Sequence, residues 1–266
     1  MKLKYILTTF IVAATLISCT NSDDTATNVS GMGTLNVEFD NAFAGDDLLL
    51  NSQAYTTSQN EVLTISTVKY IVSNIVLTKQ DGTTVTYPKG ESYFIVNESD
   101  ESTHVLELSN IPAGNYTKIK FGIGVDQGQF NAGAGGQGDF LALAQAQGML
   151  WSWSAGYKFV AFEGTFTSAT VADATPFMVH TGQIGTAYNY TEITLNLPTQ
   201  ALVRQDITPQ VHIVTDVSKF IDGTNKINLT ANNSMGMGAM IMGGGALPLI
   251  TDNLSGAFTV NHVHND

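Results

Sequence analysis

The residues that could bind a metal ion are concentrated towards the end of the chain. Two histidines stand two positions apart, His262 and His264, in a run from Ser255 to Val263 whose alternating pattern predicts a final strand. Spacing by two places both rings on one face of a strand, and imidazole suits copper and zinc. The pair could chelate a metal ion, or it could belong to a poorly ordered chain end.

Three further histidines have different surroundings. His180 lies between an apolar run and a Thr-Gly pair, at the end of a predicted strand beside a turn, where binding sites are common. His212 lies within an apolar strand pattern and could be a ligand or a structural residue. His104 follows an acidic segment and is expected to be solvated. His180 and His212 are therefore candidate ligands.

Methionine is the other soft ligand in the sequence. Four of the eight methionines fall in one glycine-rich run, as Met235, Met237, Met240 and Met242. Thioether sulfur selects the cuprous ion over zinc or calcium, so these residues indicate copper as Cu(I). The alternative is a mobile apolar loop or a filler of gaps in the core.

An aromatic stripe precedes these residues. Trp151 and Trp153 stand two apart in a run to Phe166 that predicts a strand, and Tyr157 and Phe159 continue the same parity. Such a stripe forms either core or the wall of a pocket beside a bound ion.

Composition and motifs exclude several classes of function. Removing residues 1–18 leaves 9 basic against 23 acidic residues, a net charge of −14, which repels nucleic acid. The chain has no Gly-x-Ser-x-Gly elbow and no His-Glu-x-x-His pair. Its single cysteine, Cys19, is assigned to lipidation below. The sequence predicts a binding protein and not an enzyme.

The start of the chain predicts export. Two lysines precede an apolar run from Tyr5 to Ile17, which is shorter than the roughly 20 residues that span a bilayer. The run ends in Leu-Ile-Ser-Cys, which resembles the lipobox that lipoprotein signal peptidase recognises. We expect residues 1–18 to be removed as a signal peptide and Cys19 to carry the lipid that attaches the protein to the membrane.

The remainder divides into a tether and one domain. Residues 19–33 are small and polar, typical of a flexible tether, and residues 34–266 form the predicted domain. Asp23 and Asp24 resemble an acidic export signal of surface lipoproteins. The expected location is the outer membrane, facing either the periplasm or the cell surface.

Period-two patterns dominate this domain and predict an all-β, two-sheet sandwich. Only Asp139–Gln147 and Val217–Ile221 indicate short helices, and the glycine-rich Asn131–Gly138 predicts a loop. The predicted strands before the final one are 34–39, 68–78, 83–87, 93–96, 104–108, 116–125, 151–166, 188–197, 211–217 and 227–230.

Four blocks in this order carry a resemblance to a known family. They are Val68–Leu77, the segment Gly114–Asp126, the run Met-Leu-Trp-Ser-Trp-Ser-Ala-Gly-Tyr-Lys-Phe at 149–159, and His180-Thr181-Gly182. Together they resemble the ordered motifs of the MbnP-like copper-binding protein family. The tryptophan block is the most specific of the four.

The resemblance implies a periplasmic or surface β protein that binds copper, with His180 as a ligand. In some members of the family a dihaem partner of the MauG-like type oxidises a tryptophan to kynurenine, and by position the resemblance implies that Trp151 or Trp153 would be the modified residue. Two features depart from the family. Asn131-Ala132 stands where many members have Asn-His, and their paired cysteines are absent.

Two functions follow as hypotheses. In the first, the protein binds copper for uptake, storage or delivery, alongside a copper transporter or the dihaem partner. This hypothesis expects His180, His262 or His264 to gather with at least one methionine of the 235–242 run. In the second, the domain is a surface module that recognises a glycan or a partner protein.

Overall fold

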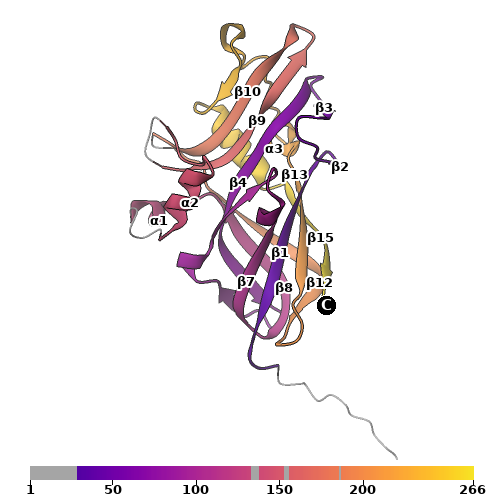
Figure 1. Cartoon of the computed structure of the whole chain (residues 1–266), viewed down its shortest axis with the longest axis vertical. Coiled ribbons are helices and arrows are strands. Elements are labelled where there is room, and N and C mark those ends of the chain that lie inside the picture. The colour runs from indigo at the N-terminus through magenta and orange to yellow at the C-terminus, as the bar shows by residue number, and fades with distance from the viewer. Residues whose placement is uncertain (1–28, 133–137, 153–155, 186) are drawn as a thin grey trace, which may run out of the picture.

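The computed structural model describes residues 29–132, 138–152, 156–185 and 187–266. Cys19, Trp153 and most of the glycine-rich loop lie outside these residues. The described chain forms two curled sheets with short helices (Figure 1). The predicted all-β, two-sheet fold is therefore confirmed.

The smaller sheet carries the chain's C-terminal strand. Its order is β15-β13-β1-β2, with β7 also paired to β1, and β1 runs parallel to β13. The first and last parts of the domain therefore lie in one sheet. Its strands are β1 (Met32–Phe43), β2 (Asp46–Asp47), β7 (Val105–Pro112), β13 (Gln210–Asp216) and β15 (Phe258–His264).

The larger sheet has the order β11-β10-β9-β4-β8-β12, with β14 on β10 and three short strands on β4. The long strand β4 occupies its centre. The strands are β3 (Ala54–Thr56), β4 (Val62–Lys79), β5 (Thr84–Thr86), β6 (Tyr93–Asn97), β8 (Gly114–Ile123), β9 (Lys158–Ser168), β10 (Val171–Ile184), β11 (Ala187–Tyr188), β12 (Thr191–Val203) and β14 (Ala239–Ile241).

The main core lies between the two sheets. Phe39 of β1, Phe121 of β8 and Phe258 of β15 are buried and pack edge to face, with Phe121 5.4 Å from each of the other two ring centres. Aromatic contacts of this geometry stabilise a core beyond the area they bury. Burial alternates along β1, so its odd-numbered residues from 35 to 39 face the core and Glu38 faces outward.

A second, smaller core covers the outer face of the larger sheet. Phe140 contacts Tyr93 and Tyr157, with ring centres 5.1 and 5.4 Å apart, and Phe159 belongs to the same cluster. Val160 of β9 belongs to the main core, so neighbouring residues of β9 serve opposite faces of the sheet. The helical segment after β8 is therefore packed on the sheet rather than extended into solvent.

The described residues contain four short α-helices. The structure places α2 (Phe140–Ala146) and α3 (Lys219–Asp222) in the two predicted regions, and adds α1 (Gln127–Asn131) and α4 (Ala246–Leu254). None of these helices is long and apolar enough to cross a membrane. Short 3-10 turns occupy Lys89–Glu91, Glu101–Thr103 and Ser234–Gly236.

Two of the predicted strands were wrong, one in its existence and one in where it begins. The segment from Ile227 to Thr230 is not a strand. Strand β9 begins at Lys158 instead of Trp151, because Leu150 pairs antiparallel with Tyr157 and the chain reverses direction between them. Gly156, with φ at 118°, supplies a conformation that side chains disfavour. Trp151 therefore does not lie on β9, although it is buried as Tyr157 and Phe159 are. Trp153, the other tryptophan of the predicted stripe, lies outside the described residues.

Candidate metal centre

Three histidines converge where β13 and β15 pair. The antiparallel register places His212 directly opposite His262, and His264 follows two residues later on the same face. Each of the three offers one ring nitrogen, and these nitrogens all lie within 4.8 Å of one another. The ring centre of His212 lies 4.1 Å from the ring centre of His262 and 5.0 Å from that of His264. The group is compact enough to hold one ion.

A β-bulge places the histidines on the outer face. Ile213 pairs with Val260 and His212 pairs with His262, so Asn261 is the extra residue in β15. Strict alternation from Val260, which packs on the core, would turn His262 inward. The bulge resets the alternation, and Val263 packs on the core while both histidines face outward.

The ring nitrogens already lie near the spacing of a coordination shell. Nε2 of His262 is 2.9 Å from Nε2 of His264. Metal–nitrogen bonds of 2.0–2.1 Å in a tetrahedral site separate two nitrogens by about 3.3 Å. An ion would replace the proton that these two nitrogens share, and the nitrogen of His212, which lies within 4.8 Å of them, would move closer to complete the site.

The end of the chain is held by hydrogen bonds. The side chain of Asn265 accepts from the Leu202 amide at 2.7 Å and donates to the Gln200 carbonyl at 3.0 Å. The carbonyl of Asp266 accepts from the Thr208 amide. These contacts fix the segment that carries His262 and His264, so the interpretation of this pair as a frayed tail loses support.

Two polar residues surround His212. Its Nδ1 contacts Glu38 on β1, and Gln210 donates to Oε2 of Glu38 at 2.7 Å. The Gln210 amide nitrogen also lies 3.1 Å from Nε2 of His212. A proton on Nδ1 satisfies all three contacts, since Nδ1 then donates to Glu38 and Nε2 accepts from Gln210. Nε2 is therefore the unprotonated nitrogen of His212, the one that can coordinate a metal ion.

The surroundings of His212 favour its neutral form. Burial lowers the pKa of His212 below that of an ordinary histidine, and the nearby His262 and His264 lower it further. Glu38 acts in the opposite direction without reversing the shift. Metal binding requires neutral imidazole, so His212 is ready to bind near pH 7.

His180 lies elsewhere, on β10 of the larger sheet. It is 3% exposed, its Nε2 is 2.6 Å from Oε1 of Glu163, and its ring centre is 5.8 Å from that of the buried Trp151. Its other nitrogen, Nδ1, is buried without a hydrogen-bond partner among the described residues. The hydrogen bond from His180 lowers the pKa of Glu163, outweighing the burial that raises it.

The methionine run does not join the three histidines. Strand β14 carries Met240 and pairs with β10 in the larger sheet, whereas the three histidines belong to the smaller sheet. In Figure 1, β10 lies at one end of the molecule and the C-terminus towards the other. Met235, Met237 and Met240 are 86%, 65% and 48% exposed, and Met242 is half-buried. The described structure thus gathers His212, His262 and His264 without these methionines, whereas β14 pairs with β10 up to Val179, the residue before His180.

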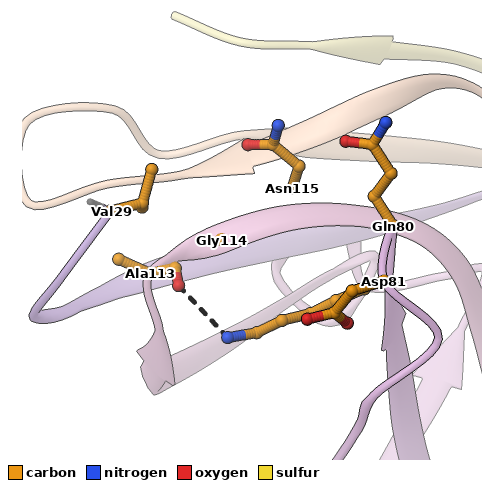
Figure 2. A pocket seen from close by; sticks show the side chains of 7 residues that line it. Val29, Gln80, Asp81, Ala113, Gly114 and Asn115 are labelled. Atoms are coloured by element: carbon orange, nitrogen blue, oxygen red, sulfur yellow. Dashed lines mark hydrogen bonds between the residues drawn. The ribbon is translucent and has the colours of Figure 1, made fainter. Parts of the chain in front are cut away.

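A surface hollow of about 570 Å³ lies beside the first described residues (Figure 2). It is lined by Val29, Gln80, Asp81 and Asn115, and the Lys79 ammonium there donates to the Ala113 carbonyl at 3.3 Å. Its lining includes none of the candidate metal ligands. The hollow adds no chemistry to the metal centre.

Comparison with known proteins identifies the family. The MbnP family model matches residues 32–241. The chain belongs to the MbnP family. Among solved structures, MbnP from Methylosinus trichosporium is similar, with 12% sequence identity, coverage of 81% of this chain and 82% of that chain, and a TM-score of 0.46. No curated protein matches the chain in sequence. The resemblance that the four sequence blocks carry is thus confirmed.

Three residues at these sites were not identified as site residues from the sequence. Glu38 and Gln210 contact His212, and Glu163 contacts His180. The sequence did contain a signal for Glu38 and Gln210, because both are polar residues at outward positions of strands that are otherwise apolar. Their contacts depend on the parallel pairing of β1 with β13, which joins segments that are far apart in the chain.

Proposed function

We propose that this MbnP-family protein is an exported lipoprotein that binds one copper ion through His212, His262 and His264. The observation that carries the proposal is the convergence of three imidazoles on a held strand pair, with ring nitrogens within 4.8 Å. Membership of the MbnP family supports copper as the ion. The role we infer is uptake, storage or delivery of copper, without catalysis.

The donor set suits this cargo. Imidazole is a ligand for copper, zinc and nickel, and of these divalent ions copper binds most tightly to a given nitrogen site. Three protein ligands leave a further coordination position open on the exposed side, where His264 lies. An ion that remains accessible can be passed to another protein, which fits delivery or storage.

Anchoring and location follow from the start of the chain. The lipobox-like Leu-Ile-Ser-Cys sequence supports lipidation at Cys19 and attachment to the outer membrane. Radiolabelled palmitate incorporation in the producing cell tests this step, and a Cys19→Ala variant is its control. Label that persists in the variant argues against the anchor.

Copper content tests the binding site. Protein comprising residues 20–266 is loaded with cupric ion, or with cuprous ion under a reductant, and dialysed against a moderate chelator before elemental analysis. We expect about one retained copper per chain. The His262→Ala/His264→Ala variant should lose it. His104→Ala should retain it, because the His104 ring bonds the Asn97 carbonyl and is not one of the three proposed ligands.

A His180→Ala variant separates the two histidine regions. If copper persists in this variant and disappears in the double variant, the three-histidine cluster is the site. If copper disappears only in His180→Ala, the region beside Trp151 binds the ion and our assignment is wrong. If the well-folded wild-type protein retains no copper, the function of a surface module for a glycan or a protein takes its place.

A further inference from the structure

The three-histidine cluster borders an acidic hollow. A cavity of about 480 Å³ is lined by Glu38, Asp40, Asp47, Glu98 and Glu101, together with His104. The carboxyl of Glu38 belongs both to this hollow and to the histidine cluster, because it contacts Nδ1 of His212. Negative charge therefore extends from the hollow to the side of the cluster.

The negative charge in this hollow is crowded. Burial raises the pKa of Asp40, and the neighbouring charges of Asp47 and Glu38 raise it further. No lysine or arginine lines the described cavity. The side chains of Glu38 and His212 are 27% and 20% exposed, so water screens their interaction only in part. A cation held by the three histidines lies one imidazole ring from the Glu38 carboxyl group.

We infer that Glu38 makes this site select cupric over cuprous copper, by fixing His212 through Nδ1 and by placing a full negative charge beside the ion. The inference rests on the proposed copper binding. The attraction between a fixed charge and an ion is proportional to the charge of the ion, so the carboxylate favours Cu²⁺ twice as strongly as Cu⁺. The ligand set adds to this preference, because it contains no thiolate or thioether.

Gln210 supports the same arrangement. Its amide nitrogen donates to Glu38 and lies 3.1 Å from Nε2 of His212, where the ion would bind. When the ion takes that position, Gln210 can keep its hydrogen bond to Glu38. The carboxylate is thus held in place both with and without the ion, and carboxylate–histidine–metal arrangements of this kind strengthen the ligand.

The test compares affinities for the two oxidation states. Cupric ion is titrated against a competing chelator, and cuprous ion is titrated under a reductant against bicinchoninate. Glu38→Gln keeps an oxygen that accepts from Nδ1 and removes only the charge. We expect its cupric affinity to fall about tenfold. Its cuprous affinity should fall about threefold, because a monovalent ion feels half the interaction.

Glu107→Gln is the matched control. Glu107 lies on β7 opposite Asn36, so it is on the same outer face, one strand away from Glu38. Glu107→Gln removes an equal charge from a residue with no contact to His212. The cupric and the cuprous affinity should therefore each change by less than about twofold. Glu38→Ala should also disturb the His212 tautomer, which ¹⁵N chemical shifts report: we expect the proton on Nδ1 in the wild-type protein and a mixture in this variant.

The outcomes separate the two proposals. If the wild-type protein binds neither ion, the proposed copper function fails. If it binds copper but Glu38→Gln alters both affinities equally, or leaves both unchanged, the inference about Glu38 is overturned while copper binding stands. A proton on Nε2 of His212 in the wild-type protein also overturns it.

Discussion

The hydrogen bond between His180 and Glu163 gives a prediction that does not depend on copper. Glu163→Gln preserves the shape and the acceptor oxygen but removes the charge. The bond of 2.6 Å then changes from charge-assisted, worth about 1.5–3 kcal/mol, to neutral, worth about 0.5–1.5 kcal/mol. Because the Glu163 side chain is 26% exposed, we take the lower part of this difference, a loss of about 1 kcal/mol at pH 7.

The loss should depend on pH in one direction. The pKa of Glu163 is lowered in the folded protein, so its ionised form stabilises the fold above the ordinary pKa of a glutamic acid. That contribution disappears as the pH falls below this value and through the folded pKa. We expect the wild-type protein and Glu163→Gln to differ by about 1 kcal/mol at pH 7 and to converge towards pH 3.

Urea unfolding at pH 7, 5 and 3 measures the difference. Glu192→Gln is the control, because Glu192 pairs with Lys120 at 3.1 Å on the exposed part of the same sheet and should contribute less than about 0.5 kcal/mol. A difference for Glu163→Gln that stays constant from pH 7 to pH 3 refutes the reasoning. An equal loss in Glu192→Gln also refutes it, since burial would then have no effect.

Three further predictions concern the metal centre and the tryptophan segment. Cupric ion at about 100 times its Kd should stabilise the wild-type domain by about 2.7 kcal/mol and raise its Tm by about 5–10 °C, and a scan of His262→Ala/His264→Ala should show no such rise. Asn265→Ala removes two hydrogen bonds at the chain end and should weaken copper binding about fivefold to tenfold in the competition titration. An unchanged copper affinity would mean that β15 keeps its position without the Asn265 hydrogen bonds. Gly182→Ala places a methyl group 2.5 Å from the Tyr157 carbonyl oxygen and 3.0 Å from the Trp151 ring. We expect it to lower the free energy of unfolding by about 2 kcal/mol and to alter the near-ultraviolet circular dichroism spectrum. An unaltered spectrum would contradict the close packing of Gly182 against Trp151.

Local pattern was sufficient for most of the fold. The alternation of core and outward residues in β1 and β4 is visible in the sequence, and helix α2 lies within its predicted region. Helix α4 was missed although Leu247, Ile250 and Leu254 are spaced for one buried face. Only the glycine-rich run before it was interpreted from the sequence, with a loop as one alternative. Pro248 lies in the first turn of the helix, where it leaves no intrahelical hydrogen bond unmade.

The tryptophan segment was predicted less well, for a physical reason. Alternation from Trp151 to Phe159 fits a strand. Leu150 and Tyr157 nevertheless form an antiparallel bridge, so these two residues cannot belong to one continuous strand. A glycine within an alternating run can mark either a bulge or a turn, and only its φ distinguishes them. Trp151 nevertheless lies against His180, the residue that the family resemblance gave as a ligand, and strand parity alone could not provide this contact.

The histidine cluster marks the boundary between what local pattern determines and what pairing determines. Spacing by two correctly placed His262 and His264 on one face. That this face is the outer one depends on a single extra residue, Asn261. The third ligand comes from β13, which pairs with β15, and its carboxylate comes from β1, which pairs with β13. A one-residue change of register would turn both rings of β15 into the core and bring Val263 to the surface. The candidate metal centre is therefore a property of strand register. Residues that maintain this register, such as Asn265 and the core-facing Val260 and Val263, should matter to the proposed copper binding although they donate no ligand.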